Sequence, residues 1–199
     1  MTPELDIALA SRHPKIYPPY ANDGRFGFEC LDGWVDLLDA AAGLIQKHVD
    51  ETGADQVFAR QVKEKFGGLR IYTWNADDRA LAIFDLVEGL SSFICEECGR
   101  LGSITKRNGW LRCRCPEHLP SEGLMVSCSV PTEHSALILM ELMDTALRFF
   151  EYNAQSCLKW LTQPALALGA VSPVSIISSD IGRNQILRLL RQIEFGVLP

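Results

Sequence analysis

Helical periodicity begins near residue 32, after an N-terminal stretch interrupted by several prolines. Residues 1–29 are therefore expected to be largely irregular, with a short helix near residues 5–11. From Asp32 onward, apolar residues recur at the three- and four-residue spacing of one helix face: Trp34, Leu37, Leu38, Ala41, Leu44, Ile45 and Val49. The pattern predicts a long amphipathic helix with Asp32 as its N-cap.

A β-hairpin is predicted next. Apolar and polar residues alternate in 69–74, which is the period of a strand, and Phe66-Gly67-Gly68 separates this segment from residues 56–65. Paired glycines favour a tight turn between two antiparallel strands. A second amphipathic helix, centred on residues 83–94, then leads directly into Cys95.

The remaining sequence is helical in pattern after a connection rich in proline, serine and glycine at 119–132. An apolar helix is expected over 137–150, and Ser172-Pro173 is typical of a helix start. The predicted class is α+β. Residues 1–118 would form an α+β module with a metal-binding segment at 95–118, 119–132 a linker, and 133–199 an all-helical domain.

The last helix is predicted to bury one apolar stripe, and Gly196 is well placed to end it. The stripe consists of Ile186, Leu189, Leu190 and Ile193. Arg183, Arg188 and Arg191 are interpreted as lying off that stripe. With Gly196 and Val197 of the apolar tail, these arginines are the candidate partner-binding residues, the alternative being a tail that folds back on its own domain.

Composition narrows the class of protein. Hydrophobic residues make up 47% of the chain, charged residues 22%, and the net charge is −6, so no global basic field draws the chain to nucleic acid. No apolar run approaches the ~20 residues of a membrane span. The N-terminus lacks the pattern of a signal peptide, and a cytoplasmic location is expected.

Four metal ligands are predicted from spacing. Cys95-x2-Cys98 and Cys115-x2-His118 each place two donors on one tight turn, called a knuckle below, and sixteen residues separate the two knuckles. Sulfur and imidazole donors in a closed four-coordinate site suit Zn2+ in a structural role. Cys113 is an alternative to Cys115, because residues two apart on a strand share a face.

No catalytic pattern is evident. The histidines other than His118 have no nucleophile beside them in a familiar arrangement, and no phosphate-binding or dinucleotide-binding glycine loop is present. The chain is therefore expected not to be an enzyme.

The C-terminal region resembles the toxin-binding domain of Xre/MbcA/ParS-type antitoxins. The resemblance spans residues 139–199, and its fixed points are Trp160, Leu161, Pro164, Leu168, Gly169, Ser172-Pro173, Gly182, Leu190, Ile193, Gly196 and Val197. It implies a non-enzymatic antitoxin that blocks a protein toxin, such as a RES-type toxin that degrades NAD. The N-terminal helix-turn-helix usual in such antitoxins is not apparent.

The N-terminal region is similar to a group of uncharacterised proteins of phages and prophages. The similarity rests on Gly27–Trp34, Gln61–Arg70 and the two knuckles, and it implies a fold and a cellular setting but no reaction. The alternative function is that of a nucleic-acid-binding accessory protein, through the basic residues Arg107, Arg112 and Arg114.

Two further questions stay open at the level of sequence. The charged residues of Gln61–Arg70 either cradle an anion or form ion pairs within the hairpin. The pattern also leaves open whether the chain forms a homo-oligomer.

Overall fold

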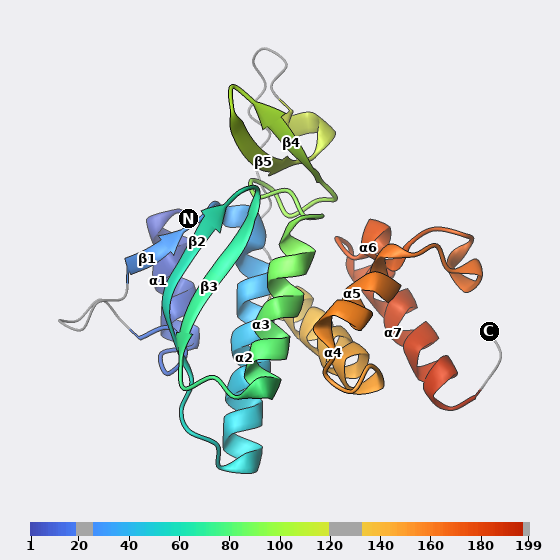
Figure 1. Ribbon diagram of the computed structural model, residues 1–199, viewed down its shortest axis with the longest axis horizontal. Helices are drawn as coiled ribbons and strands as arrows, with labels where there is room; N and C mark the ends of the chain where they lie inside the picture. Colours follow the sequence, from blue (N-terminus) through green and yellow to red (C-terminus); the bar gives the residue numbers. More distant parts are fainter. Residues whose placement is uncertain (19–25, 120–132, 197–199) are drawn as a thin grey trace.

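The computed structural model describes residues 1–18, 26–119 and 133–196. The N-terminal part contains α1 (Pro3–Arg12), β1 (Phe26–Glu29), the short helix η1 (Asp32–Trp34), α2 (Val35–Thr52), β2 (Phe58–Lys65), β3 (Gly68–Trp74) and α3 (Asp78–Ser91). A small hairpin follows, formed by β4 (Ser103–Arg107) and β5 (Trp110–Arg114), with the turn η2 (Pro116–His118) after it. The C-terminal part contains α4 (Glu133–Phe149), α5 (Ala154–Thr162), η3 (Leu166–Leu168), α6 (Pro173–Ile176) and α7 (Asp180–Glu194). The predicted α+β class is confirmed (Figure 1).

The larger sheet has the order β1-β2-β3, with β1 parallel and β3 antiparallel to β2. Val62 and Leu69 are buried on the face that packs against the helices, because α3 lies against β3. Tyr72 and Trp74 are about half exposed. The sheet is therefore covered on one face only, as the alternation in residues 69–74 indicates.

Both hairpins turn through two residues in the left-handed conformation. Phe66 and Gly67 have φ of 57° and 84°, and Asn108 and Gly109 have φ of 49° and 84°. This arrangement matches the right-handed twist of the flanking strands. The predicted β2–β3 hairpin is confirmed, but its turn uses Phe66 where two glycines were expected, because Gly68 is already part of β3.

The start of α2 differs from the prediction. Asp32 begins η1 instead of capping the long helix, and its Oδ1 accepts a hydrogen bond from the Thr2 N–H at 2.7 Å. Trp34, fully buried, precedes α2 and donates its indole N–H to the Ile94 carbonyl at 2.7 Å. Trp34 is thus a core residue that ties the start of α2 to the end of α3.

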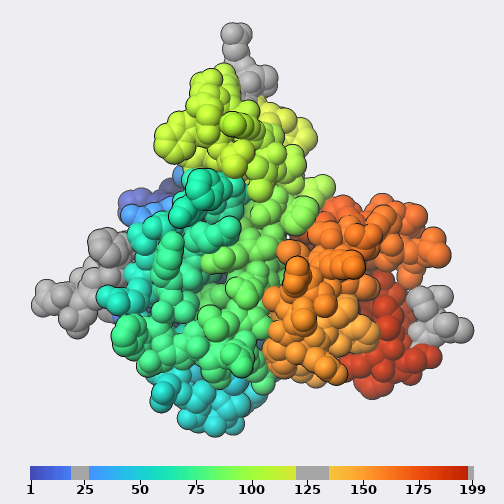
Figure 2. Space-filling view, in the orientation of Figure 1, coloured from blue at the N-terminus to red at the C-terminus, as the bar shows by residue number. Residues whose placement is uncertain are grey.

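The C-terminal helices share one hydrophobic core with the N-terminal part. Helix α4 packs against both α2 and α7, and α5 packs against α3, so the orange and red helices lie beside the green one (Figures 1 and 2). The predicted linker falls, apart from Leu119, outside the described residues, and the domain boundary stays a prediction. Within the described ranges no helix is both long and apolar enough to cross a membrane.

Candidate metal centre and partner-binding helix

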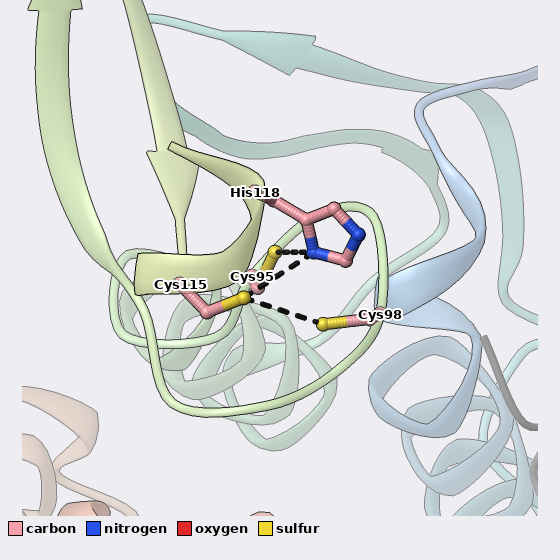
Figure 3. Close-up of side chains that lie close together, drawn as sticks. All are labelled: Cys95, Cys98, Cys115 and His118. Atoms are coloured by element: carbon pink, nitrogen blue, oxygen red, sulfur yellow. Dashed lines mark hydrogen bonds between the residues drawn. The ribbon is translucent and has the colours of Figure 1, made fainter. Parts of the chain in front are cut away.

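The two predicted knuckles meet because the β4–β5 hairpin returns the chain to the end of α3. In the first knuckle the Gly99 N–H donates to the Cys95 carbonyl at 2.9 Å, with Gly99 at a φ of 74°. In the second, the His118 N–H donates to the Cys115 carbonyl at 3.0 Å. Figure 3 shows the four side chains of Cys95, Cys98, Cys115 and His118 converging from these two turns.

The spacing of the four donor atoms fits a single metal ion. All four lie within 4.8 Å of one another. The Cys98 and Cys115 sulfurs are 3.6 Å apart, and His118 Nδ1 lies 3.5 Å from Cys95 Sγ and 3.2 Å from Cys115 Sγ. Tetrahedral coordination with sulfur and imidazole ligands requires donor separations of about 3.6–3.8 Å. The cluster can therefore hold a four-coordinate metal without rearrangement of the backbone.

The surroundings of the cluster favour metal ligation as well. The other ring nitrogen of His118 lies 3.5 Å from Glu97 Oε2, and Arg114 Nε lies 3.0 Å from Glu97 Oε1. A carboxylate on the second nitrogen fixes the orientation of a ligating imidazole. The predicted ligand set comes together, and with Cys95 and Cys115 buried the geometry is that of a closed site.

The thiols of the cluster have unequal acidity. Burial raises the pKa of Cys95 to about 12, although backbone N–H groups oppose it. Burial also acts to raise the pKa of Cys115, but hydrogen bonds from the His118 backbone N–H and from the Cys98 side chain bring it down to about 7. A bound cation favours the thiolate form of both groups.

Cys113 lies outside the cluster. Its side chain is buried, and Sγ donates to the Ser92 carbonyl at 3.3 Å. Burial raises the pKa of this thiol to about 12. Of the two alternatives left by the sequence, the structure brings Cys115 to the donor group.

The metal cluster is packed closely onto the N-terminal part through Gly33 of η1. The Gly33 N–H donates to the Glu96 carbonyl at 2.9 Å, and a Cβ at Gly33 would lie 2.2 Å from the Cys95 carbonyl oxygen. Only glycine allows the two backbones to approach so closely. The glycine of the Asp-Gly-Trp sequence thus positions the first knuckle.

A second candidate site is the exposed stripe of α7, defined as Ile181, Asn184, Arg188, Gln192 and Phe195. These residues recur at three- and four-residue spacing and share one side of the helix. Ile181 and Phe195 are each 76% exposed. Two shallow hollows, of about 430 and 320 Å³, flank the stripe, and Arg188 and Gln192 line both.

The three arginines predicted to contact a partner have different surroundings. Arg183 is 4% exposed, which corrects its assignment to the free face of the helix. Its guanidinium donates to Asp36 Oδ2 at 2.8 Å and to the Ile177 and Ser135 carbonyls at 2.8 Å each. Arg183 lies three residues before Ile186 and seven before Leu190, so helical spacing already placed it on the buried stripe.

Arg188 and Arg191 are exposed. Arg191 forms an ion pair with Glu141 of α4, whereas Arg188 has no ion-pair partner among the described residues. Ile193, predicted to be buried, is 37% exposed. Gly196 has a φ of 66° just after the end of α7, as a C′ glycine requires. Val197 lies outside the described residues.

Comparison with known proteins gives one match. Residues 140–196 match the family model of the antitoxin Xre/MbcA/ParS C-terminal toxin-binding domain. The matched region begins within α4 and includes all of α5, η3, α6 and α7. No curated protein and no solved structure matches the chain. The match supports the predicted resemblance of the C-terminal part, and the similarity of the N-terminal part to phage and prophage proteins stays a prediction.

Proposed function

We propose that this protein is a non-enzymatic antitoxin whose C-terminal part binds a protein toxin through the exposed stripe of α7. The observation that carries the proposal is the match of residues 140–196 to a toxin-binding domain. Within that region, the stripe combines a cation without an internal ion pair with two apolar residues at 76% exposure. No packing within the described chain accounts for these exposed side chains.

The chemistry of the stripe suits a protein interface. Arginine and aromatic residues dominate the binding energy of protein interfaces when a partner excludes water around them. Arg188 lies between the two hollows, where it could accept a carboxylate of the toxin, and Phe195 lines the larger hollow. Arg183 has a separate task, since its buried ion pair with Asp36 holds α7 against α2.

The toxin is proposed to be a RES-type enzyme that degrades NAD, and inhibition is proposed to occur by steric blockade of its active site. The tail from Gly196 onward would follow α7 into the toxin's cleft. The metal cluster is assigned a structural Zn2+, because three sulfurs and one imidazole in a closed site suit this ion. We place the pair of proteins in the cytoplasm.

Co-expression with the protein encoded by the neighbouring gene tests this function. Growth and the cellular NAD concentration should fall when the neighbour is expressed alone and recover with the full chain. Arg188→Glu should abolish recovery, whereas Lys159→Glu, the same charge change at an exposed site of α5, should not. A chain ending at Phe195 tests the tail separately.

The possible results separate the parts of the proposal. Recovery of growth without any change in NAD would retain the antitoxin and reject the RES-type toxin. Full activity of Arg188→Glu in a stable, soluble chain would reject the α7 stripe as the contact surface. A neighbour that is neither toxic nor retained by the full chain in a pull-down would reject the antitoxin function.

A further inference from the structure

A second exposed surface, called the hairpin face below, lies on the opposite part of the molecule from α7. It consists of Arg60, Lys63, Lys65, Phe66, Tyr72 and Trp74 of the β2–β3 hairpin, together with Lys106, Arg107 and Trp110 at the tip of β4–β5. The teal β2–β3 tip lies directly against the yellow-green β4–β5 hairpin (Figure 2). The contact is close, since a Cβ at Gly67 would lie 3.2 Å from Ile104 Cγ2.

Four aromatic rings project from this face. Trp110 is 71% exposed, Phe66 66%, Trp74 52% and Tyr72 46%. Large aromatic residues normally contribute to a core, and none of these four belongs to the buried cluster. Phe66 has a φ of 57°, a left-handed conformation that costs a bulky residue on the order of 1 kcal/mol. An exposed ring retained at such a position indicates a binding role.

Cations accompany the rings. Arg60 lies over the Trp74 ring at 5.7 Å, Lys63 over Tyr72 at 4.9 Å, and Lys65 over Phe66 at 5.3 Å. These three cations, with Lys106 and Arg107, have no ion-pair partner in the described part of the chain. The face is therefore positively charged although the whole chain carries a net charge of −6.

The acidic residue between these cations is already neutralised. Glu64 accepts hydrogen bonds from Arg112 of β5 at 3.0 Å and from the Gly67 N–H at 2.7 Å. The expectation that the hairpin pairs its own charges is thus wrong for Glu64, whose cation comes from the other hairpin. This pairing joins the two hairpins and leaves the lysines beside it available to a ligand.

A hollow of about 540 Å³ lies between the two tips, and Lys65, Phe66, Lys106 and Trp110 line it. Its walls thus combine two exposed rings with two unpaired ammonium groups. A ligand that fills it should present flat, unsaturated rings to Phe66 and Trp110 and negative charge to the lysines. Nucleobases linked by phosphates meet both requirements, and bases stack on protein aromatic rings with little regard to sequence.

We propose that the hairpin face binds single-stranded nucleic acid. Protruding rings can stack only on bases that are not already stacked in a duplex, so a single strand fits the four aromatic residues better than double-stranded DNA. An acidic peptide would satisfy the cations but leave the rings without partners. The proposal does not depend on the antitoxin function, because the hairpin face lies outside the region matched to the toxin-binding family.

Fluorescence anisotropy with the full chain tests the proposal. The probes are labelled oligothymidylate and oligouridylate of about ten nucleotides and a duplex of the same length. Both or either single strand should bind more tightly than the duplex. The logarithm of affinity should fall with the logarithm of salt concentration with a slope of about −3 if four cations contact phosphates.

Matched variants locate the site. Phe66→Ala and Trp110→Ala should each weaken single-strand binding roughly tenfold or more, while Trp110→Phe should retain most of the affinity. Phe195→Ala removes an equally exposed ring from α7 and should have no effect. Lys65→Gln with Lys106→Gln should lower the salt slope, and Lys159→Gln should not.

Far-UV circular dichroism confirms that each variant is folded before binding is compared. Equal affinity for the duplex and the single strands, or single-strand binding unaffected by both aromatic variants, would overturn the proposal. Absence of binding to all three probes would overturn it as well.

Discussion

The metal-binding segment and the C-terminal helices are held in place by different forces. Among residues 95–118, those that are buried are Cys95, Glu96, Cys113 and Cys115. The C-terminal helices instead bury a continuous set of aliphatic residues: Leu139, Leu142, Met143, Ala146, Leu147, Leu161, Ile177, Ile186 and Leu190. The first region has almost no hydrophobic core of its own, whereas the second is stabilised by burial of apolar surface.

This difference affects what each region can present to a partner. A segment fixed by metal ligands needs few apolar side chains inside, so its aromatic and basic residues can lie on the surface, as Trp110 does. The helical part uses one side of α7 for its core and leaves the other side for recognition. The two candidate binding surfaces therefore depend on separate sources of stability and can be disrupted one at a time.

Removal of the metal should have the largest effect on this contrast. Cys98→Ala, or a strong chelator, should abolish metal binding, which contributes on the order of 10 kcal/mol in small structural sites. Hydrogen–deuterium exchange should then show loss of protection in β4 and β5 with little change in α4 and α7. Unfolding of the helices together with the hairpin would show that the two regions are not independent.

Cys113→Ala is the matched control for the metal site. It removes a buried thiol next to the cluster, so elemental analysis should still give one metal ion per chain. A loss of metal from this variant, but not from Cys98→Ala, would reject the assigned ligands.

Arg183→Ala should have the next largest effect, this time on the helical part. The substitution leaves Asp36 without its buried cation, and breaking a buried ion pair costs about 3–5 kcal/mol. Urea denaturation should show this loss in the free energy of unfolding while the metal content stays unchanged. Arg188→Ala, on the exposed side of the same helix, should change stability by less than about 0.5 kcal/mol, and equal losses in both variants would contradict the assigned positions.

Asp77 allows a smaller test within the N-terminal part. It caps α3 by accepting the Ala80 N–H at 2.9 Å, and it faces His48 Nε2 at 2.6 Å. Burial acts to raise the pKa of Asp77, but these hydrogen bonds outweigh it and hold the pKa below the usual 3.8. Asp77→Ala should cost about 1 kcal/mol near neutral pH.

The pH dependence of this difference follows from the lowered pKa. The stabilisation by Asp77 is present above the unfolded-state pKa and is lost as the pH falls through the folded-state value. Urea midpoints of the wild type and of Asp77→Ala should therefore converge in acid. The neighbouring Asp78→Ala, which lacks the capping hydrogen bond, should show a smaller difference; a gap that widens in acid would contradict the assignment.

Much of the architecture was predictable because it depends on local spacing. The three- and four-residue recurrence of apolar positions predicted α2, α3 and α7, and strict alternation predicted β3. The two-residue gap within each knuckle predicted four donors that the structure brings within 4.8 Å. These features were readable because each depends on residues only a few positions apart.

Errors arose where a residue's surroundings come from distant parts of the chain. Asp32 looked like a helix cap, yet its carboxylate meets the backbone N–H of Thr2 thirty positions away. Glu64 looked like a partner for cations of its own hairpin but pairs with Arg112. Of these cases only Arg183 had a local signal that placed it correctly.

The sequence by itself determined the helices and strands, the ligand spacing and the resemblance of the C-terminal part to toxin-binding domains. Only the tertiary structure decided that Arg183 is buried against Asp36, 147 positions away, and that the tips of the two hairpins meet in one basic, aromatic face. The physical reason is that periodicity reports which side of an element is apolar. Which distant charges and rings then become neighbours is decided by how the elements pack.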